Sequence, residues 1–594
     1  MVSSHVADKT ARVVAASTRS KPFWPMLGLV AALIGVPIIG GDFFAYQIAL
    51  FLIYGIATQG VALCWGRLGF LPLGQALFFG LGAYLSGGAL KLLAGRPALI
   101  VIGIVVALTL PSLLAWVVAR LIFSRSSRSG SFFSLITLAM TMLGFLIVQQ
   151  WSSVTGGFNG MGEIPEIPGL ERYSTFYWLV AVVALLSTLS LGVLIRRPLG
   201  VLWTAVAQNE DRLQLFGYAT DRIKAQAYAI SALLAAVAGA LFSVDQGIVT
   251  PETMGFGLST EFVIWAAIGG KASPYGALVG AVLVGFASAE LRDLFAYWEV
   301  LVALAAIFVV RFSPGGLADL LTRRWHVATA WHPEPTNAPP VEALPQLSLK
   351  FADVRVSQSA VKILDGLSFE LHGPGIRAVI GPNGAGKTSA FNAMTGRLHV
   401  RAGRIHVGEH DVTAYTAWKV ARLGVGRKLQ IPSVFADLSV AQNLAIALWA
   451  GRLRGFAVLG HAPLGWHTAL LDELLQYFPE LREQGATLAG RLSQGQRQAL
   501  ELVMTLLPEP KMLLLDEPCA GLSPAETHHM IKVIRRAVER LGAAALLIEH
   551  DLAAVAALGG EVLVLHQGRL LAQGSLETLQ SNPEVRKVYA GAHK

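Results

Sequence analysis

The chain has 594 residues, of which 54% are hydrophobic and 14% are charged, and its formal net charge is +9. Soluble domains average roughly 25% charged residues, and the deficit here lies almost entirely in the first half of the chain, so several domains of different character are expected. No stripe of basic and aromatic residues accompanies the positive charge, which argues against nucleic acid as a partner. The chain has two cysteines, Cys64 and Cys519, and they fall in different halves, which argues against a disulfide framework or a metal cluster.

Apolar stretches of about the ~20 residues that cross a bilayer as a helix recur along the first half. They predict an all-α, multi-pass membrane domain over residues 23–322, which is surrounded by membrane lipid. Residues 1–22 are expected to form a cytoplasmic N-terminal segment. No small-residue cleavage site follows the first run, so it is expected to be retained. The expected spans are Trp24–Ile39, Phe43–Cys64, Phe70–Leu92, Leu99–Phe123, Phe132–Val148, Trp178–Ile195, Tyr228–Ile248 and Trp298–Val310.

Basic residues at the ends of the spans predict the orientation, because Lys and Arg are enriched in cytoplasmic loops. Arg19 and Lys21 place the N-terminus inside, and six crossings return the chain to the inside at Arg196 and Arg197. Three apolar stretches remain before a second half that must also be cytoplasmic, so one of them is not a simple crossing. Residues 261–289, interrupted by glycines and a proline, are expected to be re-entrant or to form two short half-helices.

Three features of the membrane half bear on its mechanism. Charged side chains are nearly absent from the spans, although ion-driven carriers usually need them there, so the energy is expected to come from elsewhere. Small residues in Gly74–Gly88 and Gly276–Gly285 allow close helix packing or line a path. The Gly- and Pro-rich loop Thr155–Tyr173 is expected on the outer side, as a rigid mouth or as a plain connector.

The cytoplasmic stretch Arg197–Lys224 is polar and amphipathic. We interpret it as the surface that receives the second half of the chain, because a connector would not need such patterning; a solvated surface helix is the alternative. The apolar residues of its expected helical face are Ala207, Leu213, Leu215, Phe216 and Tyr218.

A linker with five prolines, residues 323–346, separates the halves and predicts a semi-rigid spacer. Strand and helix patterns then alternate over residues 347–594. The stretch "IRAVIGPNGAGKTSAFNAM" reads as strand, glycine loop and helix, and matches G-x-x-x-x-G-K-[ST], whose backbone N–H groups surround the phosphates of ATP. The residues expected to bind ATP here are Gly381, Asn383, Gly384, Gly386, Lys387 and Thr388.

Two further motifs follow in the second half. "MLLLDEP" is a buried strand that ends in two carboxylates, of which Asp516 suits Mg²⁺, together with the hydroxyl of Thr388, and Glu517 suits polarising the attacking water. "LSQGQRQALEL" places Ser493 immediately before a helix, where its hydroxyl and the free amides form either an anion site or an ordinary helix cap.

In this order the three motifs resemble those of the ATP-binding-cassette (ABC) ATPases, an α/β P-loop fold with a helical subdomain. The resemblance implies that Gln430, in "RKLQIPSVFADLSV", contacts Mg²⁺ and the attacking water, and that His550, in "LLIEHD", senses the γ-phosphate. It also implies that Ser493, Gly495 and Gln496 act in trans, on nucleotide held by a second ATPase domain.

The chain departs from that family's pattern at two positions. Gln494 stands where the signature usually has Gly, and Gln358 stands near the position that usually stacks an aromatic ring on adenine. Base stacking contributes about 1–3 kcal/mol, so the affinity for adenine nucleotides is expected to be lower or less selective.

The membrane half resembles the inner-membrane permeases of branched-chain amino acid and urea uptake systems, so that a permease of the LivM type precedes an ATPase of the LivG type. In that family the two are normally separate subunits, whereas here they are fused. The matching pieces are Gly69–Tyr84, Thr155–Met161, Phe216–Leu241, Ser259–Ala281 and Ser313–Leu321.

The resemblance implies an ATP- and Mg²⁺-dependent importer in the inner membrane, with its ATPase domain in the cytoplasm. Branched-chain amino acids are the first expected substrates, and urea or short amides the next. The implied partners are a second permease and a second ATPase chain, or a second copy of this chain, and an extracytoplasmic solute-binding protein. Two alternatives remain. A half-exporter would show long charged helices beside the spans, which this sequence lacks. A non-transporting regulator would tolerate loss of Glu517 or His550, but both residues are present.

Overall fold

The computed structural model describes residues 23–125, 130–313, 315–318, 336–341, 345, 347–358, 361–453, 455–460 and 466–591. The expected N-terminal segment 1–22 and residues 323–335 of the expected linker lie outside the described residues. The chain divides into two compact units, Met1–Ala207 with Thr220–Thr329, and Gln208–Ala219 with Ala330–Lys594. The second unit therefore contains twelve residues that the chain contributes from within the membrane half.

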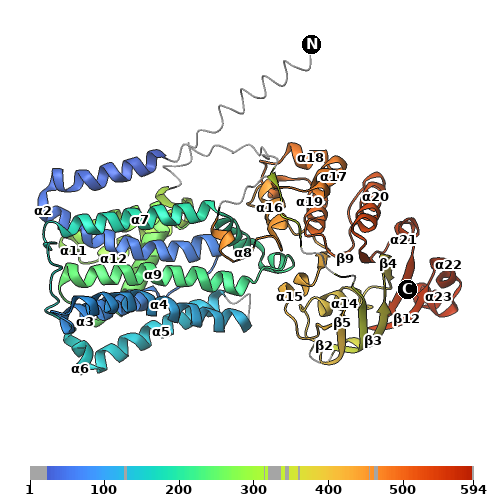
Figure 1. The fold of residues 1–594 in the computed structure, drawn as a ribbon, viewed down its shortest axis with the longest axis horizontal. Coiled ribbons are helices and arrows are strands. Elements are labelled where there is room, and N and C mark those ends of the chain that lie inside the picture. Colours follow the sequence, from blue (N-terminus) through green and yellow to red (C-terminus); the bar gives the residue numbers. More distant parts are fainter. Residues whose placement is uncertain are drawn as a thin grey trace, which may run out of the picture. The chain divides into compact units, whose positions relative to one another are not determined.

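The first unit is built from long helices that run alongside one another (Figure 1). Among the described residues, six helical segments are long and apolar enough to cross a membrane. Five of them overlap one or two of the predicted spans, and the sixth, Pro274–Arg292, overlaps the interrupted stretch 261–289 instead. The predicted spans Phe70–Leu92 and Trp298–Val310 correspond to helices that are not among the six. The prediction of an all-α multi-pass domain is confirmed. The helices are α2 (Phe23–Ala62), α3 (Gln75–Leu92), α4 (Pro97–Arg125), α5 (Gly130–Gln150), α6 (Ser152–Thr155), α7 (Phe176–Arg196), the start of α8 (Pro198–Gln214), α9 (Thr220–Gln246), α10 (Phe256–Gly269), α11 (Pro274–Leu294) and α12 (Trp298–Phe312).

The first two predicted spans form one element, α2, which contains a kink. Gly41 has φ 72° and ψ −177° inside it, so two helices meet there. A positive φ is accessible to glycine at little energetic cost. The chain therefore changes direction at a residue that the sequence places between the two predicted spans.

Helix α9 lies at the centre of the first unit and packs against α2, α3 and α4. Its contact with α3 depends on glycine, because a Cβ on Gly239 would lie 1.9 Å from the carbonyl oxygen of Phe79, and one on Gly82 would lie 2.3 Å from that of Ala236. Small residues allow helix backbones to approach this closely in membrane proteins. Close packing thus accounts for Gly82 of the small-residue stretch Gly74–Gly88 and for Gly239 of α9.

The interrupted stretch 261–289 divides as predicted, but unequally. Helix α10 has 14 residues and α11 has 21, and α11 is long enough to count among the six candidate spans. The expectation of two short half-helices is therefore wrong for α11, because the break at Gly270–Ser273 falls nearer to the start of the stretch. A Cβ on Gly269 would lie 2.1 Å from the carbonyl oxygen of Gly276, so the two helices cross at small residues.

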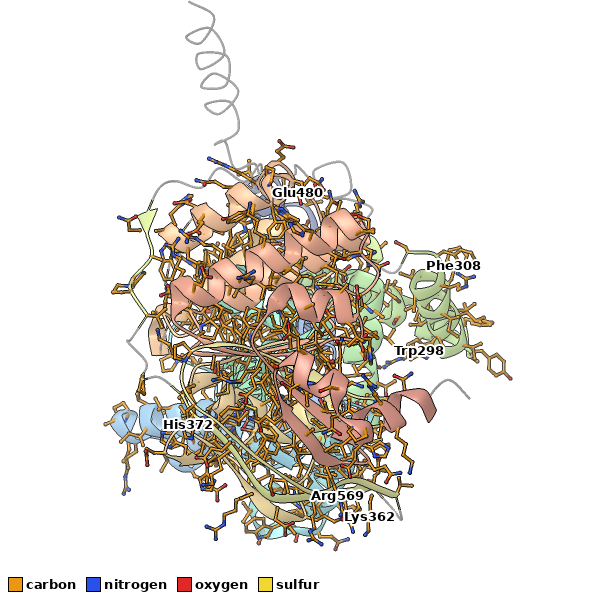
Figure 2. All side chains as sticks on the ribbon, turned by 90° about the vertical axis from the view of Figure 1, so that its right-hand side faces the viewer. Trp298, Phe308, Lys362, His372, Glu480 and Arg569 are labelled. Carbon is orange, nitrogen blue, oxygen red and sulfur yellow. The ribbon has the colours of Figure 1, made fainter. Side chains whose placement is uncertain are left out.

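The outer helices of this unit expose apolar side chains. On α12, Ile307 and Phe308 are 65% and 62% exposed, and Figure 2 labels Phe308 and Trp298 on this helix. On α5, Leu135 is 63% exposed. Exposed leucine, isoleucine and phenylalanine on helices of this length suit contact with lipid or with other membrane helices.

The second unit is an α/β fold, as predicted, and it contains two main sheets. One sheet has the order β12-β11-β4-β10-β9-β7, with all neighbours parallel except β12 and β11, and the other has the antiparallel order β3-β2-β5-β6. The strands are β2 (Leu349–Gln358), β3 (Val361–Leu371), β4 (Gly375–Ile380), β5 (Ala402–Val407), β6 (His410–Asp411), β7 (Val425–Lys428), β9 (Met512–Asp516), β10 (Ala544–Ile548), β11 (Glu561–His566) and β12 (Arg569–Gly574); β1 (Thr336–Asn337) pairs only with β8 (Trp466–His467).

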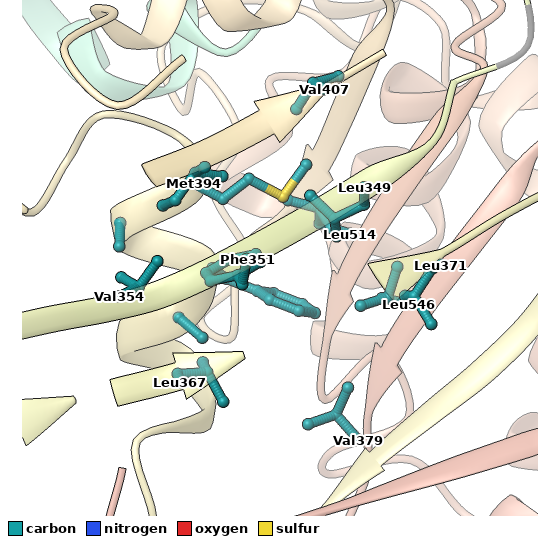
Figure 3. Packing of buried hydrophobic residues seen from close by; sticks show 14 of the residues in the cluster. Leu349, Phe351, Val354, Leu367, Leu371, Val379, Met394, Val407, Leu514 and Leu546 are labelled. Atoms are coloured by element: carbon teal, nitrogen blue, oxygen red, sulfur yellow. The ribbon is translucent and has the colours of Figure 1, made fainter. Parts of the chain in front are cut away.

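A single hydrophobic cluster joins both sheets to α14 (Lys387–Met394) (Figure 3). Phe351 of β2 and Met394 of α14 meet Leu514 of β9 and Leu546 of β10 in this cluster. Burial of each such side chain stabilises the fold by about 1.5–3 kcal/mol. The core therefore holds β4 and β9, which carry the two phosphate-site motifs, at the same sheet.

Further helices complete the second unit. Those that form the predicted helical subdomain are α16 (Val440–Trp449), α17 (Ala469–Tyr477), α18 (Pro479–Glu483) and α19 (Gln494–Leu506). The others are α15 (Ala417–Arg422), α20 (Pro524–Leu541), α21 (Leu552–Leu558), α22 (Leu576–Ser581) and α23 (Pro583–Gly591).

Candidate nucleotide site and the segment 208–219

The glycine loop lies between β4 and α14, as the sequence predicts. Gly381 has φ 153° and Gly386 has φ 97°, both in the region that favours glycine. A Cβ on Gly381 would lie 2.2 Å from the carbonyl oxygen of Leu565, so β11 leaves no room for a side chain there. The loop leads into the N-terminus of α14, where free backbone N–H groups and the helix dipole favour an anion.

Lys387 is buried and lies over this loop. Its Nζ donates hydrogen bonds to the carbonyl oxygens of Gly381 (2.7 Å) and Pro382 (3.1 Å). Burial lowers the pKa of the amine, while the carboxylates Glu517 and Asp516 oppose that change. The ammonium group is thus held at the mouth of the loop by neutral carbonyl groups, which phosphate oxygens can replace as partners.

Asp516 ends β9 beside the phosphate loop. It is 1% exposed, and its Oδ1 accepts a hydrogen bond of 3.4 Å from the hydroxyl of Thr388. Burial raises the pKa of this carboxyl group, whereas Arg427 and Thr388 lower it. A buried carboxylate beside a hydroxyl at the phosphate loop is the type of oxygen donor set that Mg²⁺ prefers, so these residues fit the predicted metal.

The three predicted catalytic residues meet directly. Glu517 Oε1 is 2.7 Å from Nε2 of His550, and Glu517 Oε2 accepts a hydrogen bond of 3.1 Å from Nε2 of Gln430. The parallel pairing of β9 and β10 sets Asp516 opposite Ile548, which brings the two strand ends together. Glu517 has φ 45°, an unusual value for a side chain of this size, and unusual backbone conformations of this kind cluster at functional sites.

The signature residues form a second, separate group. Ser493 caps α19, its Oγ accepting from the N–H of Gln496 (3.2 Å) while Gln496 Oε1 accepts from the N–H of Ser493 (3.0 Å). A Cβ on Gly495 would lie 2.9 Å from Oε1 of Glu526. Within the part of the chain that the structure describes, the hydrogen bonds of Ser493 and Gln496 join them to each other and not to the phosphate loop. The helix cap is therefore real, and a role in trans stays a prediction.

The two departures from the ABC pattern lie at exposed positions. Gln358 is exposed at the end of β2. Asn383, a predicted nucleotide-binding residue of the phosphate loop and not a departure from the pattern, is also exposed. Gln494 is exposed at the start of α19, and its Nε2 would lie 2.6 Å from a Cβ on Gly521.

The segment Gln208–Ala219 groups with the ATPase residues, which confirms the interpretation of residues 197–224 for this part. Helix α8 is kinked at Asn209 (φ −154°, ψ 84°), where the segment begins. Its apolar residues Leu213, Leu215 and Phe216 are 0%, 6% and 7% exposed. The hydroxyl of Tyr218 donates a 2.8 Å hydrogen bond to the carbonyl oxygen of Ile446 in α16.

Arg212 anchors the segment through a fully buried guanidinium group. It donates to the carbonyl oxygen of Arg427 in β7 (2.7 Å) and to the hydroxyl of Thr505 in α19 (3.0 Å), and it forms an ion pair of 3.4 Å with Glu501. Lys428 lies 3.5 Å from the second carboxylate oxygen of Glu501. Two cations thus face one carboxylate, with all three side chains fully buried.

This cluster continues to the candidate catalytic residues. Glu501 Oε1 accepts a hydrogen bond of 3.3 Å from the backbone N–H of Leu429, the residue before Gln430. Arg212 therefore contacts both the strand that leads to Gln430 and the helix that Ser493 caps. The sequence analysis missed Arg212, Lys428 and Glu501; the available signal was Glu501 itself, a lone carboxylate in the otherwise apolar stretch "ALELVMTLL".

Gly381→Ala is expected to destabilise the ATPase unit and to weaken ATP binding. The added methyl group would overlap the carbonyl oxygen of Leu565, so either the loop or β11 must shift. Overpacking of this kind costs about 1–3 kcal/mol. Thermal unfolding with and without ATP measures both effects, and Gly574→Ala, where a Cβ meets open space, is the matched control. Unchanged ATP affinity in Gly381→Ala would contradict the proposed fit of the loop.

Two protein families match the two halves of the chain. A family described as the permease component of branched-chain amino acid transport systems matches residues 43–311. The ABC transporter family matches residues 364–520. The two matches follow each other along one polypeptide, on either side of the proline-rich stretch.

Curated relatives match the second half. The high-affinity branched-chain amino acid transport ATP-binding protein BraF of Pseudomonas aeruginosa is 31% identical over 238 residues, which are 38% of this chain and 91% of that protein. The corresponding protein LivG of Salmonella typhimurium is 33% identical over 233 residues, again 38% of this chain and 91% of that protein. A probable LivG of Archaeoglobus fulgidus is 30% identical over 236 residues, 39% and 91% of the two chains.

The folds of the two units, the glycine loop and the carboxylates beside it agree with these matches. The ATPase half is an ATP-binding, ATP-hydrolysing component, and the helical half makes the chain a membrane protein. The chain therefore belongs to the ABC transporter family, as a permease of the branched-chain amino acid transport type fused to its ATPase.

Proposed function

We propose that this chain is an ATP-driven importer subunit that takes up branched-chain amino acids across the inner membrane, with its ATPase unit in the cytoplasm. The observation that carries the proposal is the continuous set of contacts from Arg212 through Glu501 and Leu429 to Gln430 and Glu517. The chain inserts residues 208–219 from the permease half into the ATPase fold, at the strand that leads to the catalytic residues.

In the proposed hydrolysis of ATP, each residue of the site has one role. Glu517 orients and polarises the attacking water, and His550 and Gln430 hold the carboxylate through the hydrogen bonds at 2.7 and 3.1 Å. Lys387 transfers its hydrogen bonds from loop carbonyls to the phosphate oxygens. Mg²⁺, held by Thr388 and Asp516 with Gln430 nearby, would supply charge neutralisation at the phosphates.

A second ATPase domain completes the site in this proposal. Ser493 is exposed at the N-terminus of α19, remote in its hydrogen bonding from the phosphate loop of the same chain. We assign Ser493, Gly495 and Gln496 to nucleotide bound by the other domain, since their helix N-terminus favours an anion. The second domain is provided by another permease and ATPase or by a second copy of this chain, and an extracytoplasmic solute-binding protein delivers the solute.

Branched-chain amino acids are favoured because the permease family and the relatives are named for that transport. Urea and short amides are the second candidates, on the resemblance of "TGGFNGM" and "EFVIWAAIGG" to permeases of that branch. A half-exporter is disfavoured because α8 enters the ATPase unit as a short kinked segment and not as a long cytoplasmic helix.

The direction of transport is tested in inside-out vesicles that contain the full chain, preloaded with radiolabelled leucine and a solute-binding protein. Addition of ATP outside is expected to empty the vesicles of leucine, because the ATPase units face the medium and import then runs outward. A parallel preparation with labelled urea separates the two substrate classes. ATP-driven accumulation of solute inside these vesicles would identify an exporter and overturn the proposal.

A further inference from the structure

The C-terminal end of α9 carries a buried carboxylate that the expectation of nearly charge-free spans did not anticipate. Asp245 is 0% exposed, and its Oδ2 accepts a 2.8 Å hydrogen bond from Nε2 of Gln246, but its Oδ1 has no hydrogen-bond partner. A negative charge in the last turn of a helix is also disfavoured by the helix dipole. An ionisable side chain in this setting is costly in stability unless a cation or a set of donors meets it.

A guanidinium group is held at the same end of α9 without neutralising this carboxylate directly. Arg172 Nε donates to the carbonyl oxygen of Val244 (2.9 Å), and Nη2 donates to that of Ile164 (3.3 Å). Among the described residues, no ion pair joins Arg172 to Asp245, although Arg172 bonds to the neighbouring residue of the helix. A Cβ on Gly247 would lie 2.7 Å from Nη1 of Arg172, so the glycine makes room for the guanidinium group.

The loop Thr155–Tyr173 is fixed against this end of α9 and is more than a plain connector. Met161 and Val249 form an antiparallel bridge, and the N–H of Ile164 donates to the carbonyl oxygen of Gly247 (3.1 Å). The loop thereby delivers Arg172 to a defined place. The aromatic ring of Tyr173, at the end of the loop, lies 5.0 Å from that of Tyr46 in α2.

Phe242 lies one turn before Asp245 in α9, and aromatic side chains of α2 and α10 pack near it. Phe242 precedes Asp245 by three residues, so both lie on one face of the helix. Tyr54 of α2 stacks on Phe242 with ring centroids 6.0 Å apart, and Trp265 of α10 lies 5.5 Å from Tyr54. Tyr54 and Phe242 are each only partly buried.

We propose that this end of α9 binds the solute, and that the solute is a zwitterionic α-amino acid. Its ammonium group donates to Asp245 Oδ1, its carboxylate faces the guanidinium group of Arg172, and its aliphatic side chain packs on Phe242 and Tyr54. The inference rests on the proposed import function. Urea and neutral amides lack the positive charge that a buried carboxylate requires, so the same geometry selects against them.

The test measures binding of radiolabelled leucine to the full chain in lipid nanodiscs, by scintillation proximity, with unlabelled competitors. Leucinamide keeps the ammonium group but lacks the carboxylate, 4-methylpentanoate keeps the carboxylate but lacks the ammonium group, and urea has neither. The variants are Asp245→Asn and Arg172→Gln. Glu163→Gln is the matched control, since it removes a charge from a side chain that is 90% exposed in the same loop.

The expected result is selective for each charge. Asp245→Asn lowers the affinity for leucine about 10- to 100-fold, as loss of a charged hydrogen bond implies. In this variant leucinamide no longer competes better than urea, whereas 4-methylpentanoate competes as it does with the wild type. Arg172→Gln shows the reverse pattern, and Glu163→Gln binds as the wild type does. A variant that merely misfolds weakens all ligands together and cannot produce this crossed pattern.

Three outcomes would overturn the inference: wild-type affinity for leucine in Asp245→Asn, an equal loss for all competitors, or no binding of leucine by the wild-type chain. The import function itself is judged separately, from leucine transport in the vesicles. Transport that requires Glu517 but is unchanged in Asp245→Asn leaves the importer intact and removes this site. Absence of ATP-driven leucine loss in every preparation removes the importer.

Discussion

Glu517→Gln is expected to reduce ATP hydrolysis about 10²- to 10⁴-fold, the range for loss of a general base, and to abolish transport while ATP still binds. Glutamine keeps the length of the side chain and its hydrogen bond to Gln430, but it cannot take a proton from water. The hydrogen bond to His550 also changes, because the group that then faces its ring is the amide NH2, which donates and does not accept. Phosphate release measures hydrolysis, and nucleotide titration with Mg²⁺ measures binding.

The control for this variant is Glu480→Gln. Glu480 lies in the first turn of α18, outside the motifs of the phosphate site, and Figure 2 labels it. The same loss of charge there is expected to leave hydrolysis and transport unchanged. Undiminished transport by Glu517→Gln would refute the role assigned to the carboxylate. Loss of ATP binding in that variant would instead assign Glu517 to nucleotide binding.

Arg212→Met is expected to uncouple hydrolysis from transport. The methionine fills much of the space of the arginine stem, but it cannot donate to Arg427, Thr505 or Glu501. Removal of one partner of a buried ion pair costs about 3–5 kcal/mol; Lys428 still faces Glu501, which favours the lower end of that range. The segment 208–219 then loses its anchor, while the residues around Glu517 stay in place.

The measurement is the number of solute molecules moved per ATP hydrolysed, in the same vesicles. We expect this ratio to fall at least tenfold in Arg212→Met, with ATP hydrolysis retained. Asp211→Asn is the graded comparison in the same segment, because its ion pair with Arg397 (2.7 Å) is partly exposed and such pairs contribute about 0–1 kcal/mol. An unchanged ratio in Arg212→Met would show that transmission runs through other contacts.

The phosphate site could be identified from the sequence because its residues lie in short local motifs. Gly381 to Thr388 adopt their loop through positive φ values and a following helix, both of which are encoded within a few residues. Asp516 and Glu517 follow a run of buried apolar residues, whose burial and strand structure the sequence indicates directly. Local backbone preferences and hydrophobic patterning therefore suffice for these elements.

Most of the candidate membrane spans could also be predicted from the sequence, since a helix in lipid must satisfy its own backbone hydrogen bonds and be apolar over most of its length. The unequal division of residues 261–289 could not be predicted from the sequence, because glycines indicate where a helix breaks but not how long the helices on either side are. Its outcome depends on the close contact of Gly269 with Gly276.

Only the tertiary structure decided which distant charges meet. Arg212, Lys428 and Glu501 are separated by 216 and 73 positions in the chain, and nothing local in the sequence pairs them. Arg172 and Asp245 reach the same end of α9 only because the loop before α7 bridges to Val249. Electrostatic partners at such separations depend on the folded positions of whole elements, whereas turns, caps and spans depend on neighbours in the chain.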